Sequence, residues 1–336
     1  MKKILLFLLL VCTWQSYAQT QKIDSLYKTL KRYADTDTNY INTLNDLAFQ
    51  YYSINPDTTL LFAEQGISLS QKSHYDKGNV EALRNKGIAF SVMGDYTQAL
   101  NMYFQALPIA EKITYKKGIA RLYNNIAIVY NNQGNYPEAL EKHFLALKIR
   151  EELGDKTGIA ISLNNIATIY YKQHKYPEAL EKHLQSLKIK EELGDKNGIA
   201  ISLTNIATIY YSQGNYAEAL EKNLQSLKIK EELGDKSGIV YVKNGLANVY
   251  FALKDYASAL RYAQDGLYLA KNIGEKELIR DINETFSKIY EATGKYDKAL
   301  AHYKAFKLMA DSLNNKETEK KKPPIYKPNM NLIKKR

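Results

Sequence analysis

A 40-residue repeat runs through most of this 336-residue chain and constrains its fold more than any other feature. Residues 158–197 differ from residues 198–237 at only seven positions. Tandem units of this length are typical of stacked repeat arrays, because each copy can bury its apolar face only against its neighbours. The glycines that mark the period are Gly78, Gly118, Gly158, Gly198 and Gly238.

Within one unit, the apolar residues predict two helices joined by a turn. Ile159, Leu163 and Ile166 recur at spacings of three and four residues, which is the period of one helical face. A second apolar set follows over residues 176–189, and residues 213–215 of the sister unit, Gln-Gly-Asn, supply turn chemistry between the two sets. Each unit is therefore predicted to be a helical hairpin.

The sequence Leu-Gly-Asp joins successive units at residues 153–155, 193–195 and 233–235. Gly can adopt the left-handed conformation that ends a helix, and Asp can cap the helix that follows. Small residues and tyrosines also recur at fixed places, which predicts packing of small against large side chains between helices. The small residues are Ala127, Ala167, Ala207 and Ala247 in the first helix and Ala99, Ala139, Ala179, Ala219, Ala259 and Ala299 in the second.

This pattern resembles the tetratricopeptide repeat, whose unit has small residues at its eighth and twentieth places, an aromatic at the eleventh, Gly at the fifteenth and Tyr at the seventeenth. Gly134, Gly214 and Gly294 match the fifteenth place, whereas His174 and Lys254 depart from it. The usual unit has about 34 residues. The longer unit here is similar to the long-helix variety found in spindle-orientation adaptors and bacterial sensor proteins.

The resemblance implies an all-α fold, a right-handed α-solenoid of about seven helical hairpins with an N-terminal capping helix. The hairpins are expected within residues 39–317 and to start near residues 40, 78, 118, 158, 198, 238 and 278. Residues 19–38 are predicted to form the helix that shields the first hairpin. Residues 318–336 are basic and contain proline, which predicts a disordered tail.

Residues 1–18 have the features of a secretory signal peptide, with Lys2 and Lys3 before an apolar run and small residues up to Ala18. We expect cleavage after Ala18 and a protein that is periplasmic or secreted. Lipidation of Cys12 is the alternative. Cys12 is the only cysteine, so the cleaved chain would have no disulfide, and no later stretch is apolar enough to cross a bilayer.

The formal net charge of +11 raises the hypothesis of nucleic-acid binding. Lys2 and Lys3 contribute two of these charges and residues 316–336 a net six, which leaves +3 for residues 19–315. A protein that binds phosphates along its repeats would be expected to show a basic stripe there. Nucleic-acid binding through the basic tail is therefore the least favoured of the functions considered.

Histidines and paired glutamates are the residues that could suggest a metal or catalytic site. His143 and His183 share one repeat position, but Asn223 replaces them in the next unit. Equivalent atoms of stacked units lie roughly 10 Å apart, which is too far for one metal ion. We therefore predict that these histidines lie on a helix surface.

The pairs Glu151-Glu152, Glu191-Glu192 and Glu231-Glu232 recur beside lysines, which predicts a solvated helix face with ion pairs at spacings of three and four residues. The lysines are Lys148, Lys188, Lys190, Lys228 and Lys230. The chain lacks a phosphate-binding glycine loop, a Gly-x-Ser-x-Gly elbow and a His-Glu-x-x-His motif. We predict no catalytic activity, no cofactor and no metal.

By resemblance to the family, first-helix residues at the second, fifth, sixth, ninth and twelfth places line a concave groove. In this chain these places are rich in Asn, which can donate to and accept from a peptide backbone, and in Tyr, which offers rigid contact area. The alternative for any single Asn is that it faces water or a neighbouring turn. The predicted groove residues are Arg84, Arg121, Asn124, Asn125, Asn164, Asn165, Tyr171, Asn205, Tyr211, Tyr241, Asn244 and Asn248, with Asn85 and Asn131 beside them.

Family members that clamp a C-terminal carboxylate combine Asn at the sixth place with Lys elsewhere. Asn125, Asn165 and Asn205 fit this pattern, but Lys is absent from the fifth place. The favoured hypothesis is an exported, non-catalytic scaffold that binds a protein or peptide. The alternative, from resemblance to bacterial membrane sensors, is an input module with a membrane-bound signalling partner, because residues 314–321 resemble the start of a connecting helix.

Overall fold

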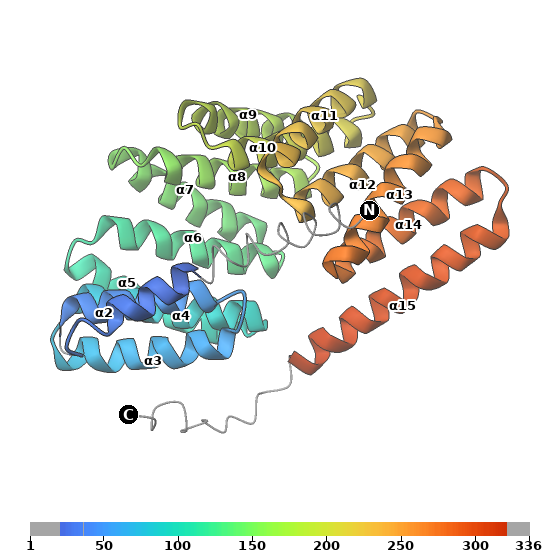
Figure 1. Ribbon diagram of the computed structural model, residues 1–336. Helices are drawn as coiled ribbons and strands as arrows, with labels where there is room; N and C mark the ends of the chain where they lie inside the picture. The colour runs from blue at the N-terminus through green and yellow to red at the C-terminus, as the bar shows by residue number, and fades with distance from the viewer. Residues whose placement is uncertain (1–20, 36, 321–336) are drawn as a thin grey trace.

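The computed structural model describes residues 21–35 and 37–320, and every regular element in these residues is an α-helix (Figure 1). The predicted signal peptide at 1–18, with Cys12, lies outside the described residues, as does the tail from residue 321 onward. In the described part of the chain, no helix has both the length and the apolar character needed to span a membrane.

Consecutive helices of the described chain pack as seven hairpins that wind into a right-handed solenoid, which confirms the predicted all-α fold (Figure 1). The hairpins are α2 (Thr38–Tyr51) with α3 (Pro56–Lys72), α4 (Asp76–Met93) with α5 (Tyr96–Lys112), α6 (Lys116–Asn132) with α7 (Tyr136–Glu152), α8 (Lys156–Lys172) with α9 (Tyr176–Glu192), α10 (Lys196–Ser212) with α11 (Tyr216–Leu233), α12 (Lys236–Ala252) with α13 (Tyr256–Ile273), and α14 (Lys276–Ala292) with α15 (Tyr296–Lys320).

A short helix over residues 21–30 precedes the first hairpin, within the segment predicted to cap it. Ile23 is buried, and the Tyr27 ring lies 6.3 Å from the Phe62 ring of α3, so this helix packs on the first hairpin. At the other end, α15 continues to Lys320, which is three residues into the segment predicted as a tail.

Left-handed residues end the helices, as the turn residues predict. Gly134 ends α6 with φ of 80°, and Gly154 follows α7 with φ of 64°. Asp155 then caps α8, because its Oδ1 accepts a hydrogen bond of 2.9 Å from the Gly158 amide. His174 and Lys254 adopt the same left-handed conformation without being glycine, with φ of 59° and 63°.

Small residues let the helices approach closely. The repeated alanines are buried at both of their places in the hairpin. In α4, a Cβ built on Gly87 would lie 2.3 Å from Cε1 of Tyr103, which is far inside normal contact. The Tyr103 side chain is 1% exposed, so glycine at position 87 is required to admit this ring into the core.

The prediction that His143 and His183 lie on a helix surface is wrong, because these side chains are 1% and 2% exposed. The equivalent Asn223 of α11 explains why: it lies against Gly245, on the first helix of the next hairpin. The second helix is therefore covered on this face by the following unit. Burial lowers the pKa of each histidine to about 4, and the nearby cations Arg150 and Lys190 act in the same direction.

The predicted solvated face of paired glutamates and lysines is only partly correct. Lys190 and Lys230 are buried, and Lys190 Nζ donates to Ser202 Oγ over 2.8 Å. The glutamates are exposed, but Glu152 pairs with Lys116 across 2.9 Å, and two further hairpins repeat this contact. Because the two helices of a hairpin run antiparallel, these pairs join the start of the first helix to the end of the second. They therefore do not have the predicted spacing of three or four residues.

Candidate partner-binding surface

The first helix of each hairpin builds the inner wall of the solenoid (Figure 1). Contacts link α2 to α4, α4 to α6, α10 to α12 and α12 to α14, so alternate helices meet directly. In a curved stack, elements on the inner radius come closest together, which places the first helices on the concave wall and the second helices on the convex one. All the predicted groove residues lie on first helices, from α4 to α12.

An amide ladder connects neighbouring first helices along this wall. Asn165 Nδ2 donates to Asn124 Oδ1 over 3.1 Å, and Asn205 Nδ2 donates to Asn164 Oδ1 over 3.1 Å. Each rung joins the sixth place of one unit to the fifth place of the unit before it. These asparagines therefore bind one hairpin to the next, in addition to facing the groove.

The ladder takes other forms towards its two ends. Thr285 of α14 replaces the donor asparagine, and its Oγ1 donates to Asn244 Oδ1 over 2.8 Å. Asn248 Nδ2 donates to the Asn244 carbonyl within α12, over 3.0 Å. In α4, Asn85 Nδ2 donates instead to the backbone oxygen of Asn45, over 2.8 Å. The side chains of Asn244 and Asn248 in α12 therefore form hydrogen bonds within their own helix or with the next first helix, α14.

Between α4 and α6 the ladder is broken. Asn125 is at the donor place, but the acceptor place of the preceding unit holds Arg84, whose side chain has no acceptor atom. Asn125 Nδ2 is consequently buried without a hydrogen-bond partner among the described residues. An unsatisfied buried donor costs about 1–3 kcal/mol.

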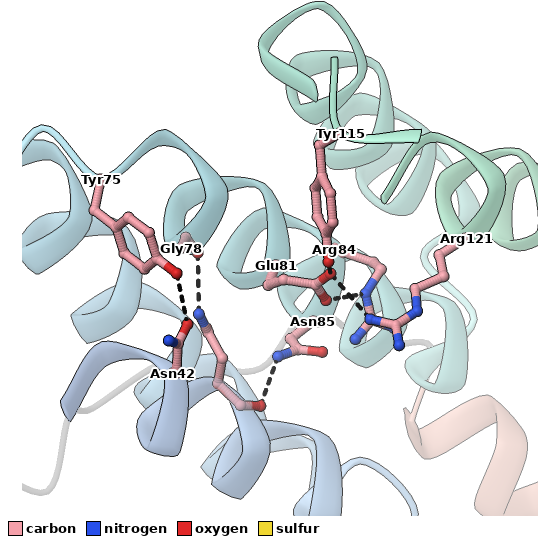
Figure 2. A network of polar contacts seen from close by, with 9 residues as sticks. Asn42, Tyr75, Gly78, Glu81, Arg84, Asn85, Tyr115 and Arg121 are labelled. Atoms are coloured by element: carbon pink, nitrogen blue, oxygen red, sulfur yellow. Dashed lines mark hydrogen bonds and ion pairs between the residues drawn. The ribbon is translucent and has the colours of Figure 1, made fainter. Parts of the chain in front are cut away.

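Glu81 of α4 lies at the centre of a charged network beside this break (Figure 2). Its carboxylate accepts from Arg84 Nε over 2.8 Å, from Arg121 Nη1 over 3.1 Å and from the Tyr115 hydroxyl over 2.9 Å. Burial alone would raise the pKa of Glu81, but the two guanidinium groups outweigh it and lower the pKa. The Arg121 side chain remains 40% exposed.

These groups line a cavity of about 840 Å³ formed mainly by α2, α4 and α6, to which the helix over residues 21–30, α5, α7 and α8 also contribute. Its lining contains five cationic side chains and two carboxylates, a formal surplus of three positive charges. Apolar side chains complete the wall, so the cavity combines a cationic centre with hydrophobic margins. The charged residues are Lys22, Asp46, Lys77, Glu81, Arg84, Arg121 and Arg150, and the apolar ones include Phe49, Ile88, Val92, Ile128 and Ile161.

Tyrosines lie farther along the same wall. The Tyr171 hydroxyl is 3.1 Å from Ser212 Oγ of the next first helix, and the Tyr211 ring packs 5.7 Å from the Tyr216 ring. Tyr241 is 53% exposed. Partial burial raises its pKa, and nearby Tyr171 adds to the effect although it lies two hairpins away, on α8. Of the predicted groove residues, Arg84, Arg121, Asn124 and Asn125 line the cavity, whereas the tyrosines lie outside it.

Sequence reasoning missed the side chains that make one part of this wall charged and another part apolar. Glu81 occupies the second place of its unit, and Ile161 and Ile201 occupy that place two and three units later. The two isoleucines are 44% and 40% exposed, which is unusual for residues of their size. Only the residue at the second place of each unit could have indicated these side chains in the sequence. An apolar residue at a place that faces the groove is not needed for the core.

The model of the tetratricopeptide repeat family matches residues 118–192, 158–232 and 238–305, which together cover more than half of the chain. The chain belongs to the tetratricopeptide repeat family. This repeat is typical of protein-interaction scaffolds and is generally not catalytic. No curated protein sequence matches the chain significantly.

Several solved structures have a similar fold at low sequence identity. A signal transduction ATPase with a tetratricopeptide repeat sensor, from Pyrococcus horikoshii, is 17% identical, with a TM-score of 0.64 over 89% of this chain and 48% of its own. The apo quorum sensor NprR from B. thuringiensis is 15% identical, with a TM-score of 0.57 over 90% and 96%. NprR in complex with its cognate peptide NprX is 19% identical, with a TM-score of 0.57 over 94% and 88%.

Proposed function

We propose that this protein is a non-catalytic scaffold that binds a peptide or protein partner on its concave wall. The observation that carries the proposal is the cavity of α2, α4 and α6, where charged groups, the unpaired Asn125 amide and exposed apolar side chains converge. NprR, a protein of similar fold, is described in complex with a peptide. This supports the view that a chain of this fold can bind a peptide.

The test is affinity capture of a partner from an extract of the source cells, with wild-type chain and with Asn165→Ala/Asn205→Ala/Tyr211→Ala. These side chains lie on the concave wall of α8 and α10. The expected result is loss of partner from the triple variant, with helicity retained in circular dichroism.

A matched control changes exposed residues of the convex wall, Lys188→Ala and Lys228→Ala. This variant should retain the partner. Equal capture by the wild-type chain and the concave triple variant would reject α8 and α10 as part of the binding surface. Loss of the partner from both variants would do the same.

A sensory role is a second candidate, favoured by the length of the last helix. α15 has 25 residues, whereas the other second helices have 17 or 18. Such a helix could transmit a binding event beyond the repeats to a membrane-bound signalling protein. A photo-crosslinker at Leu308, which is 69% exposed, should then capture a protein of the membrane fraction. Crosslinks to soluble proteins alone would oppose this role.

Export is part of the proposal and rests on the leader-like residues 1–18. Expression of the full chain in its source should yield a protein outside the cytoplasm whose first residue is Gln19. Recovery of the intact N-terminus from the cytoplasm would reject export.

A further inference from the structure

A row of large apolar side chains crosses the convex wall of the solenoid. Single exposed apolar residues are ordinary on a protein surface, but one that recurs in four consecutive hairpins indicates an interaction surface. The same place on α5, α7, α9 and α11 holds Phe104, Phe144, Leu184 and Leu224, which are 40% to 46% exposed. These four side chains are called the convex row below.

The convex row is limited to these four hairpins. The equivalent place holds Glu64 in α3 and Gln264 in α13, and both of these polar residues are exposed. An apolar side chain at this place is therefore not a requirement of the repeat itself. The row is a separate feature of the middle hairpins, on the wall opposite to the one that carries the proposed partner-binding function.

Glutamates give the wall around the row a negative surface charge. Each of α7, α9 and α11 has four exposed glutamates and two lysines that are not buried. The last glutamate of each helix pairs with a lysine of the first helix in the same hairpin, which leaves a surplus of one negative charge per hairpin. The glutamates are Glu138, Glu141, Glu151 and Glu152, Glu178, Glu181, Glu191 and Glu192, and Glu218, Glu221, Glu231 and Glu232.

We propose that the convex row binds residues 321–336 of a second copy of this chain. This segment has six basic residues and no acidic one, so its charge is opposite to that of the wall. It also carries the apolar side chains that the row requires. These are Ile325, Tyr326, Met330, Leu332 and Ile333.

The spacing of these apolar residues matches the spacing of the hairpins. Equivalent atoms of stacked hairpins lie about 10 Å apart, and an extended chain rises about 3.3 Å per residue. Three or four residues therefore span one hairpin. Tyr326, Met330 and Ile333 are four and three residues apart, so an extended segment can place one of them on each of three neighbouring members of the row.

The direction of α15 favours a second copy over the chain's own segment. α15 ends at Lys320, on the opposite side of the molecule from α9 and α11 (Figure 1). The helix thus runs away from the convex row of its own chain. The contact joins two unlike surfaces, the row of one copy and the segment of another, and such a contact can be repeated from copy to copy.

Sedimentation velocity tests this contact with the wild-type chain, a row variant and a segment variant. The row variant is Leu184→Gln/Leu224→Gln, and the segment variant is Tyr326→Ser/Met330→Ser/Ile333→Ser. The wild type should associate as its concentration rises, and each variant alone should associate at least about tenfold more weakly. A mixture of the two variants should form a one-to-one dimer, because one variant supplies an intact segment and the other an intact row.

A matched control changes two leucines outside the row. Leu153 and Leu193 lie at the joints between hairpins and are each 44% exposed, as Leu184 is. Leu153→Gln/Leu193→Gln should associate like the wild type. The concave triple variant should also associate like the wild type, which separates this contact from the proposed partner-binding surface.

Fluorescence anisotropy of a labelled peptide with the sequence of residues 321–336 tests the chemistry of the contact. The row variant should bind this peptide about tenfold more weakly than the wild-type chain. Glu181→Gln/Glu221→Gln should also weaken binding, and added salt should weaken it further, because the segment is basic and the wall is acidic.

A wild-type chain that stays monomeric at every concentration would overturn the proposal, as would equal binding of the peptide by the wild type and the row variant. Failure of the two variants to associate when mixed would also overturn it, because a contact between unlike surfaces must be restored by the mixture. Circular dichroism of each variant identifies loss of fold. Capture of a partner on the concave wall is measured separately, so its outcome does not depend on this contact.

Discussion

Replacing both buried histidines by asparagine should make the solenoid less sensitive to acid. Burial lowers the pKa of His143 and of His183 from 6.5 to about 4. Between these pH values the unfolded chain binds more protons than the folded chain, so stability falls as pH falls. The stability that the neutral histidines contribute is fully present above about pH 6.5 and is lost progressively as pH falls towards 4.

The magnitude follows from the difference between the two pKa values. At pH 5 the unfolded imidazole is almost fully protonated, whereas the folded one is about one-tenth protonated. Going from pH 7 to pH 5 should therefore lower the free energy of unfolding by about 2 kcal/mol per histidine, or about 4 kcal/mol for the pair. Burial is the larger cause of these lowered pKa values, and the cations Arg150 and Lys190 near the imidazoles contribute the rest.

The assay is urea denaturation at pH 7 and pH 5, followed by circular dichroism, for the wild-type chain and for His143→Asn/His183→Asn. Asparagine is the matched replacement, because Asn223 occupies the same place in the next unit and is buried there. From pH 7 to pH 5, the free energy of unfolding of the double variant should fall by about 4 kcal/mol less than that of the wild type. Equal losses in the two proteins would refute the reasoning, because all other titratable groups are shared.

Four further substitutions test the packing and the turns, each by urea denaturation. Gly87→Ala should destabilise the chain by about 1–3 kcal/mol, because the new Cβ would overlap the Tyr103 ring. The control Gly245→Ala should stabilise the chain by up to about 1 kcal/mol through helix propensity, because its Cβ would lie no nearer than 3.4 Å to any neighbouring atom. Equal effects would refute the packing argument. Lys254→Gly should stabilise by about 1 kcal/mol, since the residue has φ of 63°, and a loss of stability would show that this conformation is not strained. Ala179→Leu should cost about 1–3 kcal/mol, because Ala179 is fully buried, and a neutral result would indicate spare volume.

The sequence was sufficient to predict the hairpins because turn residues and helical periodicity are local signals. Gly134 and the Leu-Gly-Asp joints adopt the conformations that their chemistry favours. The burial of His143 was not predictable in the same way, because it depends on the face that the next hairpin covers. A polar residue at a position shared with asparagine gives no apolar signal, so sequence reasoning assigned it to the surface.

The concave wall was predictable in outline but not in its chemistry. The family resemblance selects the places that face the groove, and Arg84, Arg121, Asn124 and Asn125 do line a cavity. The hydrogen bonds between these places depend on the register of neighbouring hairpins, which the sequence of one unit does not specify. The role of Glu81 was missed for that reason, since its arginine and tyrosine partners come from two hairpins.

Site-specific photo-crosslinking tests the concave-wall account most directly. A benzophenone side chain placed at Ile161 or Ile201 probes the concave wall, and one placed at Leu184 or Leu224 probes the second helices at nearly the same exposure, 44% and 40% in each set. The account predicts that the captured partner crosslinks from the isoleucine positions and not from the leucine positions. Crosslinks from the leucine positions alone, or equally from both sets, would contradict it.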